Sequence, residues 1–158
     1  MRLAGHPSGA LAMHVTFGKS TPILRVSDMN RAVVYYTDVL GFRQNWGDSG
    51  FSELSRGEAN IMLAHGDQGR GEAWLYVGVN DVDALRDEIA PKGAVIRQGP
   101  SNYPWGAREL HVQDLDGNVL RFGSGATDEP FGPWLDENGI RWVYGADGRW
   151  RRSDQTPA

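Results

Sequence analysis

The chain has 158 residues, the usual length of one domain, and its 40% hydrophobic and 23% charged residues argue against general disorder. A net charge of −4 argues against binding to nucleic acid, which normally needs a basic surface. Because there is no cysteine, disulfides, thiolate metal sites and cysteine nucleophiles are excluded.

Residues 1–19 are expected to form an N-terminal extension. The first twelve residues contain one Arg and no sustained apolar stretch, so they do not resemble a signal peptide. No apolar run approaches the roughly 20 residues that a membrane helix needs. We therefore expect a cytoplasmic protein with no membrane partner.

A strand–helix unit then occurs twice. Residues 21–26 are typical of a short strand, Asp28 of a helix N-cap, and apolar residues recur at helical spacing up to Gly41. The same order returns in a strand at 74–79 that is followed by the capping Asp81. The strand starts differ by 53 residues (74 − 21), as do the capping residues (81 − 28), which indicates an internal duplication.

Three strand-like segments follow each predicted helix, at 42–47, 50–56 and 59–65 in the first unit and at 94–98, 107–113 and 118–123 in the second. Each unit is therefore β-α-β-β-β. Neither unit could bury enough apolar surface alone, so the two should share one core. We predict an α+β fold in which modules 20–65 and 72–124 form a single domain over residues 20–124.

Side-chain alternation separates two faces of the predicted sheets. One face is uniformly apolar and should lie under the helices. The other is mixed; it includes Arg25, Asn60, Met62, Trp74, Tyr76, Glu109, His111 and Arg121. Such a mixture is typical of a ligand cavity, with a half-buried dimer interface as the alternative.

The sequence contains no pattern for a catalytic residue. There is no nucleophile elbow, and no histidine spacing typical of helical metalloenzymes occurs. His6 and His14 fall in the extension and are expected to be exposed to solvent. Glu109 and His111 could supply two metal ligands from one strand face, but no third partner is evident. We therefore predict no catalytic residue, no metal and no cofactor.

Aromatic residues carry more information. Trp46, Phe51, Trp74, Tyr76 and Trp105 are spread over loops and the mixed face. Individually each fits a core position, but as a group they favour a platform on which a planar ligand stacks.

The sequence Pro104-Trp-Gly-Ala-Arg-Glu109, followed by Asp114-Leu-Asp-Gly-Asn118, closely resembles the bleomycin-resistance-like branch of the glyoxalase/bleomycin resistance/dioxygenase group, also called the vicinal oxygen chelate superfamily. The similarity covers about residues 20–124. It implies paired modules that form a curved sheet cleft, and a homodimer in which modules from two chains build each crevice.

The resemblance also implies a binding site. Metal-dependent members carry ligands at positions that correspond here to Thr21, Met62, Trp74 and Arg121, and none of these is a usual ligand. In bleomycin-binding members aromatic residues hold the drug without altering it. The implied ligand-binding residues are Trp46, Phe51, Met62, Trp74, Tyr76, Trp105, Glu109, His111 and Arg121. Because the chain is only mildly acidic and carries Arg121, a planar, partly anionic compound fits as well as a cationic bleomycin-type antibiotic.

Residues 125–158 form an aromatic tail outside the resemblance. Its turns predict a hairpin that lays Trp142 and Trp150 on the body or on a partner subunit. Three hypotheses follow: a metal-free protein that sequesters an aromatic small molecule in a dimer cleft, a metal-dependent or cofactor-free lyase or dioxygenase of the same fold, and a non-catalytic scaffold whose cleft its own tail fills.

Overall fold

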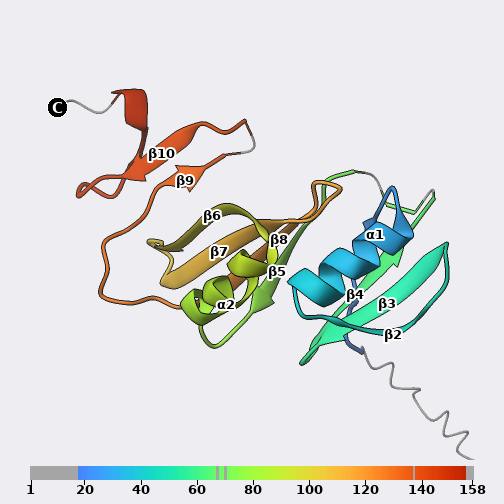
Figure 1. The fold of residues 1–158 in the computed structure, drawn as a ribbon. Helices are drawn as coiled ribbons and strands as arrows, with labels where there is room; N and C mark the ends of the chain where they lie inside the picture. Colours follow the sequence, from blue (N-terminus) through green and yellow to red (C-terminus); the bar gives the residue numbers. More distant parts are fainter. Residues whose placement is uncertain (1–17, 67, 70, 137, 156–158) are drawn as a thin grey trace, which may run out of the picture.

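The computed structural model describes residues 18–66, 68–69, 71–136 and 138–155; most of the predicted extension, with His6 and His14, lies outside them. Within the described ranges the strands form two four-stranded sheets and one three-stranded sheet. Figure 1 shows the two larger sheets side by side, with the small sheet of the tail beyond the second. None of the described helices is long and apolar enough to span a bilayer.

The first unit contains β1 (Ile23–Arg25), α1 (Met29–Val34), the π-helical η1 (Tyr35–Val39), β2 (Arg43–Gly47), β3 (Phe51–Arg56) and β4 (Ala59–Ala64). Its strands lie in the order β1-β4-β3-β2, with β1 parallel to β4. Asp28 caps α1, since its Oδ1 accepts a hydrogen bond of 3.0 Å from the backbone N–H of Arg31.

The second unit repeats this plan with β5 (Trp74–Gly78), α2 (Val82–Ile89), η2 (Ala90–Lys92), β6 (Val95–Asn102), β7 (Ala107–Gln113) and β8 (Val119–Gly125). The strand order is β5-β8-β7-β6, and Asp81 caps α2 as Asp28 caps α1. The predicted α+β fold with two β-α-β-β-β modules is confirmed. Strand β6 extends beyond the predicted residue 98, and the side chain of the added Asn102 bonds to the tail.

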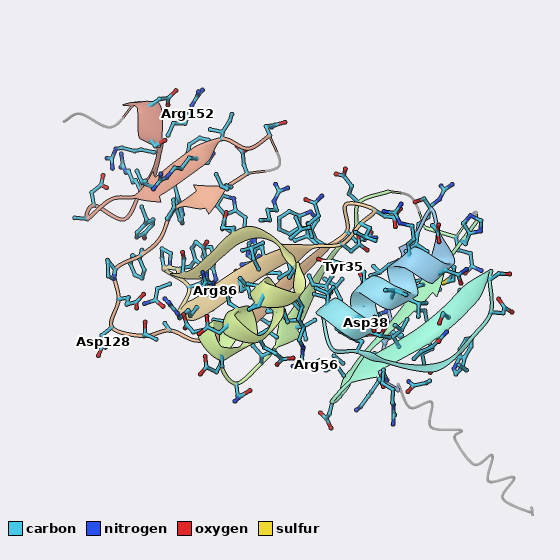
Figure 2. The ribbon with its side chains drawn as sticks, in the orientation of Figure 1. Tyr35, Asp38, Arg56, Arg86, Asp128 and Arg152 are labelled. Carbon is cyan, nitrogen blue, oxygen red and sulfur yellow. The ribbon has the colours of Figure 1, made fainter. Side chains whose placement is uncertain are left out.

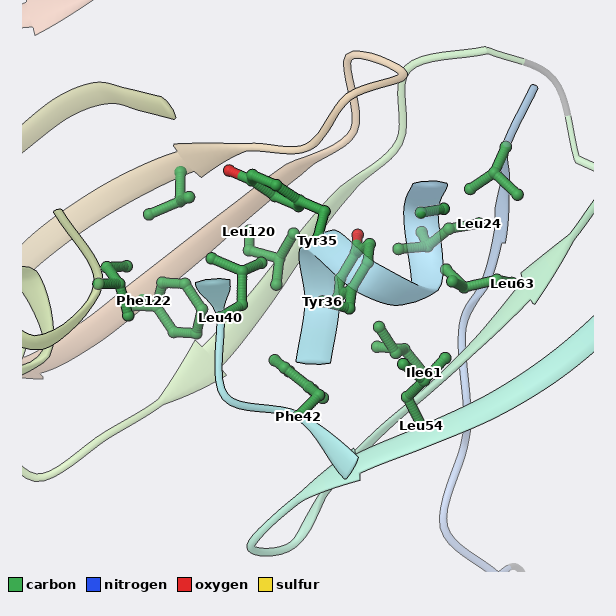
Figure 3. Packing of buried hydrophobic residues seen from close by; sticks show 14 of the residues in the cluster. Leu24, Tyr35, Tyr36, Leu40, Phe42, Leu54, Ile61, Leu63, Leu120 and Phe122 are labelled. Atoms are coloured by element: carbon green, nitrogen blue, oxygen red, sulfur yellow. The ribbon is translucent and has the colours of Figure 1, made fainter. Parts of the chain in front are cut away.

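One core joins the two units. Figure 3 shows side chains of η1 and the following turn, including Tyr36, Leu40 and Phe42, between β8 and the strands of the first sheet. The wider π-helical turn differs from the predicted regular helix. Within it the consecutive residues Tyr35 and Tyr36 are both buried. Their hydroxyls bond to the second unit, that of Tyr35 to the carbonyl oxygen of Gln113 at 2.8 Å.

The tail forms the small sheet from β9 (Trp134–Leu135), β10 (Arg141–Tyr144) and β11 (Trp150–Arg152), followed by η3 (Ser153–Gln155). The hairpin of β10 and β11 was expected. Strand β9 is an addition, because its two residues show no strand pattern and become a strand only by pairing with β10.

Candidate functional site

A polar cluster is buried on the face of the second sheet that is turned away from the core. Strand pairing sets His111 of β7 opposite Arg121 of β8, and Glu109 opposite Gly123. The residues that alternate with them point into the core. Two residues of one strand and one of its neighbour therefore meet on the same face.

The Glu109 carboxylate is the centre of this cluster and is only 1% exposed. It accepts hydrogen bonds from Arg121 Nε at 2.5 Å and Nη2 at 2.8 Å, from Trp105 Nε1 at 2.7 Å and from His111 Nε2 at 3.1 Å. Burial by itself raises the pKa of Glu109, but the hydrogen bonds from His111, Arg121 and Trp105 outweigh it and lower the pKa to about 2. Glu109 is thus a fixed anion with a built-in counter-ion.

Two glycines shape the sheet around the cluster. A Cβ at Gly123 would lie 2.0 Å from the hydroxyl oxygen of Tyr76, so Tyr76 can lie across the sheet only because this residue is glycine. Gly99 has a φ of +85°, and a Cβ there would lie 2.2 Å from the carbonyl oxygen of Glu109. Its bulge in β6 lets the backbone approach Glu109 closely.

The tail is held to β6 by side chains of that strand. Asn102 Nδ2 donates to the carbonyl oxygens of Thr127 and Glu129 at 2.8 and 2.7 Å. Further along, the backbone N–H of Leu135 donates to Gln98 Oε1 at 2.5 Å. Arg97 Nη2 donates to the carbonyl oxygen of Asp136 at 2.9 Å. These bonds set the position of β9 beside the polar cluster.

Trp134 of β9 covers the cluster. Its ring centroid lies 5.3 Å from that of His111 and 5.8 Å from that of Trp105, in edge-to-face geometry. The Arg121 guanidinium carbon lies 5.3 Å from the ring centroids of both Trp134 and Trp105. Trp105 in turn stacks on Tyr103 at 4.7 Å.

A pocket of about 630 Å³ opens between the second sheet and the tail. Its lining is Trp105, Arg121, Trp134, Asp136, Trp142 and Trp150, and we call it the tryptophan pocket. The hydrogen bond from Trp142 Nε1, at 2.9 Å, and those from two backbone N–H groups lower the pKa of Asp136, so this wall is negative. A concave, mostly aromatic pocket with a few polar groups is the usual form of a small-molecule site.

The structure separates the sequence-predicted site residues into two groups. Trp105 and Arg121 line the tryptophan pocket, with Glu109 and His111 directly beneath them. Trp74 contacts the edge of this cluster, with its ring centroid 5.6 Å from that of His111, and Tyr76 lies over Gly123.

The other group lies on the first sheet. Trp46 stacks on Phe51 with ring centroids 5.9 Å apart, and pairing of the strands sets Met62 in the same row as Trp46. None of these three lines the tryptophan pocket. Within one chain they form a separate surface, on which Trp46 is 50% exposed.

Sequence reasoning did not assign four of the pocket residues to the site: Trp134, Asp136, Trp142 and Trp150. Trp142 and Trp150 were expected to rest on the body or a partner, and Trp150 indeed faces Trp105 of the body at 6.4 Å. The available signal was the density of tryptophan in a tail that a solvent-exposed segment would not need.

The residues at the family's metal-ligand positions do not fit a divalent cation. Thr21, Met62, Trp74 and Arg121 offer no carboxylate or imidazole ligand, and Arg121 is itself a cation. The Glu109 oxygens and His111 Nε2 make the hydrogen bonds given above, while His111 Nδ1 is buried with no hydrogen-bond partner among the described residues. In the described part of the chain, no three His, Cys, Asp or Glu side chains gather as a metal-binding group.

The comparisons with known proteins agree on one family. The model of the glyoxalase/bleomycin resistance protein/dioxygenase superfamily matches residues 13–122, which end before the tail. A probable lactoylglutathione lyase of Vibrio cholerae is 25% identical over 115 residues, 62% of this chain and 83% of its own length.

Solved structures show the same fold. The bleomycin-binding protein of bleomycin-producing Streptomyces verticillus, complexed with copper(II)-bleomycin, has a TM-score of 0.59 and 28% identity. TioX of a Micromonospora species has a TM-score of 0.59 and 27% identity. Each match covers 72% of this chain and 100% of the other.

Proposed function

The chain belongs to the glyoxalase/bleomycin resistance protein/dioxygenase superfamily, and we propose that within it the protein is a metal-free binder that sequesters a planar aromatic antibiotic or metabolite. The observation that carries this proposal is the tryptophan pocket, in which four indole rings and Arg121 surround about 630 Å³. Rigid aromatic rings bind flat molecules at a low cost in conformational entropy. The complex of the Streptomyces verticillus neighbour with copper(II)-bleomycin supports a small-molecule ligand.

The alternative is an enzyme of the same fold, favoured by the similarity to a probable lactoylglutathione lyase. Lyase chemistry that relies on a Lewis acid needs open ligand positions. The Glu109 oxygens instead accept four hydrogen bonds from the chain's own side chains. This arrangement favours binding over catalysis.

Binding and metal content can be tested together. We expect bleomycin or a naphthalene probe to quench tryptophan fluorescence to saturation at one ligand per chain. The double variant Trp142→Ala/Trp150→Ala should lose at least about tenfold in affinity, since aromatic residues usually dominate binding energy. Phe131→Ala is the control, because Phe131 is 51% exposed and lies in the same tail outside the pocket lining. A stoichiometric divalent ion together with lyase activity, or no saturable binding, would contradict the proposal.

We also infer a homodimer. The first sheet exposes Ile23 and Trp46 in one row with Met62 and Glu53, next to Phe51, a largely apolar surface that a second copy can cover. Light scattering should then report twice the 17.4 kDa chain mass, and Trp46→Ser/Phe51→Ser should shift the protein toward the monomer. A native protein that is monomeric at micromolar concentration would contradict this inference.

A further inference from the structure

We propose that Arg121 makes the tryptophan pocket select planar ligands that carry an acidic group. This inference rests on the proposed function and names the chemical class of its ligand. The residue comes from β8 in the middle of the second sheet and is one of the two charged residues that line the pocket. Its side chain is 29% exposed, whereas that of its partner Glu109 is 1% exposed.

Arg121 has a donor to spare. Its Nε and Nη2 bond to Glu109, while its Nη1 has no acceptor among the described residues. If Nη1 were buried, it would be one of the buried side-chain atoms without a hydrogen-bond partner, and it is not among them. Nη1 is therefore accessible to solvent. A guanidinium remains charged at all working pH values, and a carboxylate is the acceptor it binds most strongly. A ligand carboxylate can therefore bond to Nη1 while its ring contacts the surrounding indoles.

A cationic ligand meets the opposite situation. Of the two carboxylates beside the pocket, Asp136 remains able to attract a cation, but Glu109 is buried and already accepts all four hydrogen bonds described above. The indole rings of Trp105 and Trp134 already have the Arg121 guanidinium carbon 5.3 Å from their centroids. To use these aromatic faces and this anion, a cation would have to displace Arg121. The Arg121 guanidinium thus already occupies the position beside Trp105, Trp134 and Glu109 that a cationic ligand would take.

Asp136 is the opposing charge in the same pocket. Its Oδ2 accepts from Trp142 Nε1, and its Oδ1 accepts from the backbone N–H groups of Asn138 and Ile140, all at 2.9 Å. Its negative charge weakens the attraction of an acid to Arg121 across the pocket. Asp136→Asn should therefore strengthen binding of an acidic ligand by about two- to fivefold, within the range of a partly exposed charge pair.

The experiment compares three probes with the same fused ring: 2-naphthoate, neutral 2-naphthamide and the ammonium of 2-naphthylmethylamine. Affinities for the full chain are measured by isothermal titration calorimetry. We expect the acid to bind at least about tenfold more tightly than the ammonium, as one charged hydrogen bond allows. The amide should lie between them.

The variant that tests Arg121 is Glu109→Gln/Arg121→Met, which removes the guanidinium without leaving the buried carboxylate unpaired. Its acid-to-ammonium affinity ratio should fall to within about threefold of one, by loss of the same charged bond. The control is Arg86→Met/Asp87→Asn, an exposed ion pair of 3.0 Å on α2, where Figure 2 labels Arg86. It should keep the native ratio.

The outcomes separate the two proposals. If all three probes bind with equal affinity, if the ammonium binds best, or if the double variant keeps the preference for the acid, charge selection by Arg121 is wrong while the binding function stands. If none of the probes and no bleomycin binds, the proposed function fails and this inference fails with it.

Discussion

Replacing Arg121 alone with methionine is expected to lower the free energy of unfolding by about 3–5 kcal/mol, the usual cost of removing one partner from a buried ion pair. Glu109, which is 1% exposed in the native chain, would lose two of its hydrogen bonds and its counter-ion. Urea unfolding followed by tryptophan fluorescence measures the change. Adding Glu109→Gln should restore most of the loss, because the buried group is then neutral.

The same pair predicts a pH dependence. The pKa of Glu109 is lowered from its ordinary 4.5 to about 2 in the folded chain, so its ionised form stabilises the fold at pH values above 4.5. This contribution is lost as the pH falls from 4.5 toward 2. Unfolding free energies measured across that range should decline less steeply in Glu109→Gln/Arg121→Met than in the native protein. Equal slopes, or an Arg121→Met variant as stable as the native chain, would show that the pair is not buried as described.

The β-α-β-β-β repeat was predictable from sequence because its signals are local. The N-caps at Asp28 and Asp81 stand 53 residues apart (81 − 28), and each lies between a strand and a helix in the structure. Alternation also placed Glu109, His111 and Arg121 on one face, where the structure joins them by hydrogen bonds. Hydrophobic periodicity and helix capping depend on residues close together in the chain, so a single sequence is enough to detect them.

The tail residues that cover this face of the second sheet could not be predicted from the sequence. Trp134 reaches His111 because β6 side chains, such as Gln98 and Asn102, bond to the backbone of residues 25 to 37 positions later. No periodic pattern links such positions. A strand of only two residues, such as β9, is too short to show alternating polar and apolar residues. The identity of the pocket wall therefore depends on tertiary docking, which local propensity does not encode.

Replacing Trp134 with alanine is expected to weaken binding of a planar ligand by about 30-fold or more, the effect of losing a tryptophan at the centre of a binding site. The ring forms one wall of the pocket and lies 5.3 Å from both the His111 ring and the Arg121 guanidinium carbon. Its loss also removes the ring contacts between β9 and the second sheet and should cost about 2–3 kcal/mol of stability, less than for a fully buried tryptophan. Calorimetric titration with 2-naphthoate measures the affinity. It is done without urea, at a temperature where the variant is folded.

Trp134→Phe separates the contribution of the ring from that of tail docking. Phenylalanine can keep the edge-to-face contacts with His111 and Tyr103, so this variant should retain most of the stability while losing several-fold in affinity through its smaller face. Phe131→Ala removes an exposed tail aromatic that contacts Tyr144, and it should leave binding unchanged. If Trp134→Ala binds 2-naphthoate as tightly as the native protein does, the ligand lies elsewhere, and the stacked pair of Trp46 and Phe51 becomes the surface to test.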